Sequence, residues 1–528
     1  MKRLPQFLLL FLFGCFLCSC SQKDNTTDQP VINPASLGDI PVLSIETVSD
    51  DAGVMKFVTA PVAPHVAESI ASWTPYYQMP PAPYYEACTV TLTDTDNSVL
   101  LDHADAQVKV RGNWTTSYEK KPLRIKFSEA QNLLGLNDGA TFKNWLLLAE
   151  YKDASMLRNK TAFSVARELL SEDDLYVSDA SFVEVMINGQ YWGVYLLAEQ
   201  QQINKDRVDI TEPEKGYTGT DIGYFLEFDA YFMNESELQQ FYVDYADNAA
   251  LVPFDGNDGS GRTMKCLSDP EYGRKKEVGF TIKSDIYSEE QRDFIASYVN
   301  NVYNIMYAAA YEGDAYQFTD DYSSIRKTDV MTPREAVERV VDIPSLADIY
   351  ILNELLCDAD VYWSSFYMSV DFGPEGNKKL TFEAPWDFDS AMGNKNRCLD
   401  GTGFYAANIV PDVDGGPSAG GKYETINPWL AVLIYEDWFQ SLVKEKWTKA
   451  YDSGVFERAA AMITEDTDRC SEAFLRNYDK WNNIINNGPF VNELSPKAAA
   501  CKTQKEAADF LLTWFQSRVD FLNGQWHN

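Results

Sequence analysis

Alternation of apolar and polar residues dominates the first 230 residues and predicts strands that bury one face. The clearest signal is a hairpin. Residues 181–187 and 190–197 flank Asn188-Gly189, the dipeptide most typical of a two-residue turn. The same alternation predicts further strands at residues 88–93, 108–113, 123–127, 145–149, 223–229 and 366–370.

One predicted strand, residues 123–127, carries a basic face. Its odd-numbered residues are apolar, so strand alternation places Arg124 and Lys126 together on the opposite side, and Lys121 lies just before them. In a chain with a large excess of acidic residues, this face has two open interpretations. It is either a phosphate-binding surface or a solvated strand face.

Helical periodicity appears first at residues 153–170, where an apolar stripe recurs at helical spacing and Ser155 stands where a cap is needed. Arg158, Asn159 and Lys160 occupy the first turns. The helix dipole does not favour cations there, so we expect their partners to lie elsewhere. On this helix Glu168 is the obvious acidic partner for the basic strand. Further helices are predicted at residues 289–312, 345–356, 429–446, 455–481 and 505–523.

Strands in the first part of the chain and helices in the second indicate an α+β protein. We divide the chain into five regions. They are a signal peptide (1–19), a polar tether (20–37), a mainly β lobe with one long helix (38–230), an insertion with the candidate catalytic loop and metal site (231–395), and a glycine-rich loop followed by helices (396–528).

The candidate chemistry centres on residues 379–389, which read as a strand that runs into Asp387 and Asp389. Carboxylates one residue apart at a strand end can enter one cleft and bind a hard divalent cation. A turn that uses Asp for backbone hydrogen bonds is the alternative. Just upstream, Asp358 and Asp360 follow the helix 345–356, so adjacent strand ends present both pairs of acids.

Asp371-Phe372-Gly373 spells a kinase metal motif, but it lies between two predicted strands and is followed by residues typical of a hairpin turn. We therefore interpret it as a turn. A metal-binding Asp is expected after the second strand, where Asp387 stands.

Composition narrows the chemistry. The chain has 45 Lys and Arg against 79 Asp and Glu, a net charge of −34, which disfavours nucleic acid as a partner. Only three histidines occur and none lies in a motif, so carboxylates, lysine and arginine are the expected reactive groups. Six scattered cysteines follow residue 20, enough for up to three disulfides in an oxidising compartment.

The N-terminus resembles a bacterial lipoprotein signal. Met1-Lys2-Arg3 precedes a short apolar run that ends in Leu17-Cys18-Ser19-Cys20, and Cys20 would become the lipidated residue. We expect a protein anchored by lipid in the bacterial cell envelope, with the outer membrane favoured and the folded body in the periplasm or at the cell surface. Its membrane contact would be the anchor alone.

A series of motifs runs in order along most of residues 40–525. It comprises Arg111-Gly112-Asn113, residues 120–126, Asp153 with Leu157-Arg158-Asn159, residues 188–195 with Glu199, Asn353-Glu354, Asp360, and residues 385–389. This series resembles the spore-coat protein H (CotH) kinase family of secreted or surface atypical protein kinases.

The resemblance implies a divergent protein-kinase-like fold of two lobes, a mainly antiparallel β N-terminal lobe and a mainly helical C-terminal lobe, with ATP and Mg²⁺ or Mn²⁺ between them. It implies a protein substrate in the envelope or at the surface. The residues it assigns are Asp360 for the acceptor hydroxyl, Asp387 and Asp389 for the metal, Lys121, Arg124 and Lys126 for phosphates, and Glu199 near adenine.

Two features depart from ordinary kinases. Ser365 stands five residues after Asp360, where Asn is usual, and the β lobe has no G-x-G-x-x-G loop. A kinase-like surface protein without catalysis therefore stays open. So does a glycoside hydrolase, which also works with paired carboxylates but needs no basic strand facing them.

Overall fold

The computed structural model describes residues 37–49, 55–244, 250–254, 264–265, 278–395, 400–408, 410–411, 424–481 and 493–528. The predicted signal peptide, Cys20 and the tether up to residue 36 lie outside these ranges. Within them, no helix combines the length and the apolar character that crossing a bilayer requires.

Seven strands of the N-terminal half close into a barrel in the order β1-β2-β3-β4-β5-β7-β6. Neighbours pair antiparallel except β1 and β6, whose parallel pairing closes the barrel. The strands are β1 (Val42–Thr47), β2 (Glu86–Thr93), β3 (Val99–Val110), β4 (Leu123–Gln131), β5 (Phe142–Leu148), β6 (Ala180–Ile187) and β7 (Gln190–Glu199).

The barrel confirms the predicted hairpin and the predicted faces. Asn188 and Gly189 both have positive φ angles, 49° and 71°, as a two-residue turn between twisted strands requires. Apolar side chains such as Val108, Ile125 and Trp145 fill the interior and are fully buried. Charged residues of the same strands are thereby forced onto the outer face.

A second sheet of five strands follows, in the order β16-β15-β8-β12-β9. Its strands are β8 (Gly223–Asp229), β9 (Gln240–Phe241), β12 (Gly279–Ile282), β15 (Phe366–Asp371) and β16 (Thr381–Phe382). Short two-stranded pairs are β10 (Ala250–Leu251) with β11 (Met264–Lys265), β13 (Ala315–Phe318) with β14 (Ile325–Thr328), and β17 (Val410–Pro411) with β18 (Glu424–Thr425).

Helices make up most of the remainder, so the α+β class is confirmed. They are α1 (Lys56–Thr59), α2 (Pro64–Trp73), α3 (Arg158–Leu170), α4 (Glu289–Tyr307), α5 (Pro333–Val340), α6 (Ile343–Leu356), α7 (Pro428–Ala431), α8 (Asp437–Asp452), α9 (Val455–Arg469), α10 (Ser471–Trp481), α12 (Pro496–Ala500) and α13 (Gln504–Trp526). A π-helical turn, Ala308–Glu312, extends α4.

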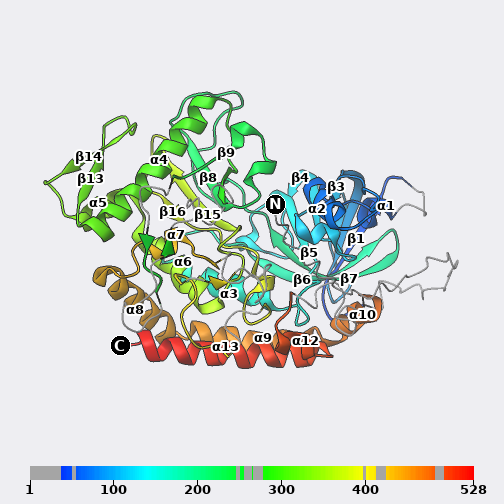
Figure 1. Ribbon diagram of the computed structural model, residues 1–528. Coiled ribbons are helices and arrows are strands. Elements are labelled where there is room, and N and C mark those ends of the chain that lie inside the picture. Colours follow the sequence, from blue (N-terminus) through cyan, green and yellow to red (C-terminus); the bar gives the residue numbers. More distant parts are fainter. Residues whose placement is uncertain are drawn as a thin grey trace, which may run out of the picture.

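The barrel lies on one side of the molecule, and α8, α9 and α13 run along the lower edge of the molecule in the view of Figure 1. The outer faces of β5 and β7 contribute Leu146, Leu196 and Ala198 to the same apolar core as α3 and α6. Helix α10 packs on β7. One face of the barrel is therefore turned toward the second half of the chain.

Three helix predictions need correction. The helix expected over residues 429–446 divides into α7 and α8, which are separated by a turn. The helix expected from residue 153 begins at Arg158, because the Asp153 carboxylate accepts from the backbone N–H groups of Ser155 (2.9 Å) and Arg158 (2.9 Å) and ends the preceding turn there. Asp153, not Ser155, thus satisfies the first helical donor. The helix expected over residues 455–481 divides at Cys470 into α9 and α10.

The disulfides that the cysteine count would allow are not formed among the cysteines that the structure describes. The described cysteines are all buried free thiols, and Cys266 and Cys398 lie outside the described residues. The free thiols are Cys88, Cys357, Cys470 and Cys501.

A buried ion pair joins α6 to α13. Glu354 and Arg518 lie 2.6 Å apart, and neither side chain has any exposed surface. The guanidinium also donates to the Glu354 carbonyl (2.7 Å) and to the carbonyls of Gly401 and Gly403, and the carboxylate accepts the Ala406 N–H (2.9 Å). Every strong donor and acceptor of this pair is thus used inside the protein.

We expect Arg518→Met to lower stability by about 3 kcal/mol, because it leaves the Glu354 carboxylate buried without its cation. Urea unfolding followed by circular dichroism measures the change. Lys505→Met, which breaks the exposed pair with Asp509, should leave the unfolding midpoint nearly unchanged. Equal midpoints for Arg518→Met and the parent would contradict a structural role for the buried pair.

Candidate functional site

Three predicted acids meet at one point. Carboxylate oxygens of Asp360, Asp387 and Asp389 all lie within 4.8 Å of one another. Asp360 comes from the loop after α6, whereas Asp387 and Asp389 follow β16. Asp387 has a left-handed backbone (φ 72°), an unusual conformation for a residue other than glycine. The tertiary structure thus brings together the loop of Asp360 and the loop of Asp387, which are 27 positions apart in the sequence (387 − 360).

The loop that carries Asp387 and Asp389 is held from α3. The side-chain oxygen of Asn159 accepts the Phe388 N–H (2.8 Å), and the side-chain NH2 group of Asn159 donates to Glu150 (3.0 Å). On the other side, the Asn394 amide donates to the Asp389 carbonyl (2.7 Å). These bonds fix the backbone between the two acids. They also supply the remote partner expected for Asn159.

Arg158 supports the same loop from the start of α3. Its guanidinium pairs with Asp153 and donates to the carbonyls of Ala391 (3.1 Å) and Met392 (3.3 Å). Lys160 donates to the Ala180 carbonyl of β6 instead. The basic first turn of α3 is therefore explained by partners in other elements, as predicted.

Lys152, which the sequence did not single out, is the cation of the acidic cluster. Its ammonium lies 3.0 Å from the Asp389 carboxylate and donates to the Ser390 hydroxyl (2.6 Å). Burial by itself lowers the pKa of Lys152, but Asp389 and Asp360 outweigh it and raise the pKa well above the usual value. Lys152 therefore stays charged beside the Asp389 carboxylate. Lys152 follows the predicted strand 145–149 as an isolated lysine. Its position gives no pattern from which its contact with the acids could be predicted.

Burial and the charges of neighbouring acids raise the pKa of two of these carboxyl groups, Asp387 and Asp358. Burial, followed by the charges of Asp389 and Asp360, raises the pKa of Asp387 to about 7. Asp358, fully buried behind the cluster, accepts the Asp360 N–H (3.1 Å), and burial raises its pKa strongly. Lys395 lies 3.8 Å from Asp360. A divalent cation would relieve this repulsion, and a set of carboxylate oxygens fits Mg²⁺ or Mn²⁺.

The basic strand face approaches the acids at one end. Arg124 lies on the outer face of β4, opposite Lys109 of β3. Its guanidinium donates to the side-chain oxygen of Asn144 (2.8 Å). Lys126 is exposed farther along β4, away from that end. The barrel residue whose charge acts on the acids is Arg111, directly after β3. Burial lowers the pKa of Arg111, and the charge of Asp387 opposes this shift, so the two groups act on each other.

Arg111 also lies over the Trp386 ring, with its guanidinium carbon 5.9 Å from the ring centroid. The Trp386 ring is in turn 5.2 Å from that of Phe163 on α3. The barrel, the acidic loop and α3 therefore meet at Trp386, next to Asp387. Arg111 opens one of the motifs found in the sequence, but its charge alone did not distinguish it there.

Lys121 lies elsewhere. Its ammonium is buried and donates to the Thr116 carbonyl, and burial alone lowers its pKa to about 8. Glu168, expected to pair with the basic strand, forms its ion pair with Arg458 on α9, so that expectation was wrong. Neither residue has a contact with the acidic cluster among the described residues.

Glu199 ends β7, where the sequence predicted it. Its fully buried carboxylate accepts from Arg207 (3.1 Å), from the Asn137 amide (2.9 Å) and from the Asp179 N–H (2.9 Å). Both oxygens are therefore occupied within the protein. A role near adenine stays a prediction and would rest on the backbone at this position.

The kinase-like tripeptide is a turn, as predicted. Asp371 ends β15, accepts the Gly373 N–H (2.8 Å) and accepts the Thr211 hydroxyl (3.0 Å). Ser365, at the position where kinases have Asn, has a left-handed backbone (φ 60°) and donates its N–H to Glu227 (3.0 Å). Asp371 thus stabilises a hairpin and takes no part in the acidic cluster.

Comparison with known families gives one match. The family model described as CotH kinase protein matches residues 108–522 of the chain, which include all the residues of the cluster. No curated protein matches the chain.

Removing one carboxylate should weaken divalent cation binding. We expect Asp387→Asn and Asp389→Asn each to lower Mn²⁺ affinity by about tenfold or more, measured by isothermal titration calorimetry. Asp371→Asn is the matched control, because it makes the same substitution in a turn outside the acidic cluster. The site would be misassigned if Asp387→Asn bound Mn²⁺ as tightly as the parent.

Cation binding should also depend on pH. Metal ligands must be deprotonated, and the pKa of Asp387 is raised to about 7, so below that pH the cation has to displace a proton. We expect Mn²⁺ affinity to fall by up to about tenfold per pH unit below neutrality and to level off above it. An affinity that is flat across this range, measured by the same calorimetry, would contradict this protonation.

Proposed function

Because the chain belongs to the CotH kinase family, we propose that it is an atypical protein kinase, dependent on Mg²⁺ or Mn²⁺, that transfers the γ-phosphate of ATP to Ser or Thr of envelope or surface proteins. The observation that carries the proposal is the cluster of Asp360, Asp387 and Asp389 with Lys152, faced by Arg111 from the barrel.

These residue types suit phosphoryl transfer, which depends mainly on positioning and charge neutralisation. Asp387 and Asp389 would hold the divalent cation, which when bound neutralises phosphate charge. Arg111 and, next along the face, Arg124 would contact phosphate oxygens. Lys152 would hold Asp389 in place, since it contacts both Asp389 and Ser390.

Asp360 is the group proposed to act on the acceptor. Its carboxylate would take the proton of the acceptor hydroxyl while the acceptor oxygen bonds to the γ-phosphorus and the bond to the β-phosphate oxygen breaks, releasing ADP. Its backbone is fixed by the Asp358 carboxylate, and Lys395 lies beside it. Both contacts orient Asp360 before substrate arrives.

In this proposal the barrel and the helical half act as the two lobes of a kinase-like fold, with the nucleotide between them. The lipid anchor at Cys20, location in the bacterial envelope and a protein substrate there remain part of the proposal. They rest on the N-terminal signal pattern and on the family resemblance.

A kinase-like protein without catalysis is the second candidate. The observation that favours it is Ser365, which replaces the usual metal-binding Asn and whose backbone is engaged by Glu227. A glycoside hydrolase has less support, because one of the clustered acids is neutralised by a buried lysine and a basic face meets the others.

Asp360→Asn should lower phosphate transfer from γ-labelled ATP to an acceptor protein by about a hundredfold or more, because proton removal from the acceptor is lost. Nucleotide binding, measured by calorimetry in the presence of Mn²⁺, should change little. Asp371→Asn serves again as the control and should keep both the parental rate of phosphate transfer and the parental nucleotide affinity.

Each outcome separates the candidates. If the parent protein binds nucleotide but Asp360→Asn transfers phosphate at the parental rate, the role of Asp360 is wrong. If the parent binds no nucleotide with or without the cation, the kinase proposal fails and the non-catalytic candidate is favoured.

A further inference from the structure

A separate cavity of about 210 Å³ lies between the end of α4, the segment 250–254 and the connection from α7 to α8. None of the acids of the candidate kinase site lines it. Ligand pockets for drug-sized molecules measure roughly 300–1,000 Å³. This one therefore suits a small head group or a single side chain. It is lined by Val252, Ala310, Tyr311, Val432, Tyr435 and Glu436.

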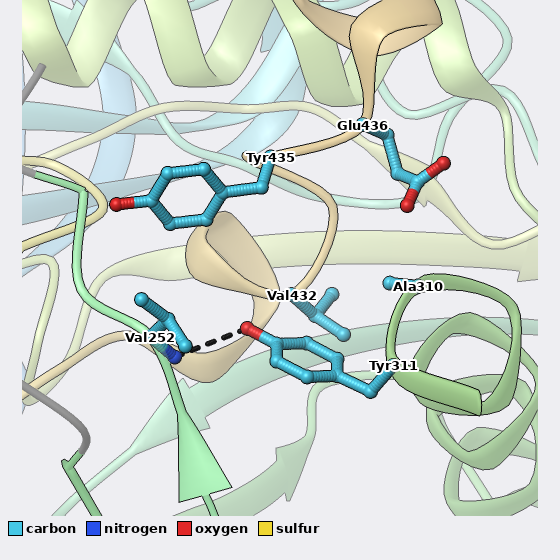
Figure 2. Close-up of a pocket in the computed structure, with 6 residues that line it drawn as sticks. All are labelled: Val252, Ala310, Tyr311, Val432, Tyr435 and Glu436. Atoms are coloured by element: carbon cyan, nitrogen blue, oxygen red, sulfur yellow. Dashed lines mark hydrogen bonds between the residues drawn. The ribbon is translucent and has the colours of Figure 1, made fainter. Parts of the chain in front are cut away.

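Two aromatic rings dominate the lining and are held in place. The Tyr311 hydroxyl accepts the Val252 N–H (3.1 Å), and the Tyr435 hydroxyl donates to the Pro253 carbonyl (2.8 Å). Figure 2 shows both hydroxyls directed toward the side of the cavity where Val252 lies. The rings themselves line the cavity. Both rings are thus anchored at their polar ends to the segment 250–254, and their π faces are the surfaces that would meet a cation.

Neighbouring rings reinforce this arrangement. Tyr311 stacks on Tyr307 (centroids 4.7 Å apart, 11° between planes), and Tyr435 packs edge-on against Phe254 (5.6 Å). Tyr311 belongs to the π-helical turn Ala308–Glu312. Such turns occur mostly as local interruptions of α-helices and are frequent at functional sites.

The charge in the lining is negative. Glu436 stands at the edge of the cavity opposite the hydroxyls (Figure 2), and one of its oxygens accepts the Trp438 indole N–H (2.9 Å). Burial raises the pKa of the Tyr311 phenol, and the charge of Glu436 adds to the shift, so the carboxylate acts on that ring. The lining residues include neither Lys nor Arg.

A ring face and a carboxylate both attract a cation. A primary ammonium needs several hydrogen-bond acceptors close together, whereas this lining offers one carboxylate, Glu436, and two phenol oxygens that already take part in hydrogen bonds. Methyl groups, by contrast, fit Val252, Ala310 and Val432. We propose that this cavity binds a methylated ammonium group, with Tyr311 and Tyr435 providing the aromatic faces and Glu436 the counter-charge.

The test uses choline as the probe and its uncharged carbon isostere, in which a tert-butyl group replaces the trimethylammonium group. Binding to the whole protein is measured by nuclear magnetic resonance titration at constant ionic strength. We expect saturable choline binding and an affinity for the isostere about threefold to thirtyfold weaker, because only the cation gains from the rings and the carboxylate.

Variants separate the site from the general negative charge of the protein. Glu436→Gln and Tyr435→Leu should each weaken choline binding by about threefold or more, whereas Tyr435→Phe, which keeps the ring face, should retain it. Asp437→Asn, an exposed acid next to Glu436 that does not line the cavity, is the matched control and should bind as the parent does. Thermal unfolding checks that each variant is folded.

The proposal is overturned if choline shows no saturable binding, if the uncharged isostere binds as tightly, or if Glu436→Gln leaves the affinity unchanged. Equal losses in Glu436→Gln and Asp437→Asn would also overturn it, because they would show attraction to the surface charge only. None of these outcomes bears on the proposed kinase activity, since the two sites share no residue.

Discussion

Repulsion among clustered carboxylates is the constraint on which the candidate site depends. Carboxylate oxygens of Asp360, Asp387 and Asp389 lie within 4.8 Å of one another. At this distance the negative charges of Asp389 and Asp360 disfavour ionisation of Asp387. Such a cluster persists only if the backbone is held firmly and at least one opposite charge is fixed nearby. Lys152 provides the charge, and the hydrogen bonds of Asn159 and Asn394 hold the loop. The remaining excess of negative charge is what makes the cluster suited to a divalent cation.

The barrel supplies the other half of the electrostatics. Its interior is filled by apolar side chains, so charged residues on β3 and β4 have to project outward. The outer face of β5 and β7 packs into the core of the helical half, which brings the neighbouring basic face alongside it. Arg111 is the residue that reaches Asp387, because it follows the end of β3 closest to the acidic loop.

Much of this arrangement was predictable where the signal is local. The hairpin at Asn188-Gly189, the turn at Asp371 and the acids at 387 and 389 follow from spacing within a few residues. Helix boundaries were less accurate, because Asp153 ends a turn by bonds that periodicity does not reveal. Lys152 was missed because its partner, Asp389, lies more than 200 positions away, and Lys121 drew attention only through its neighbours in sequence.

The sequence by itself determined the α+β class, the alternating faces of the strands and the set of acids around residue 387, since each depends on side-chain periodicity or on residues close in the chain. Only the tertiary structure decided which cations meet those acids. Ion pairing depends on distances across the fold, and a lysine or arginine carries the same charge wherever it stands. Burial then decides what that charge does, making Lys152 the permanent partner of Asp389 and removing Lys121 from the site.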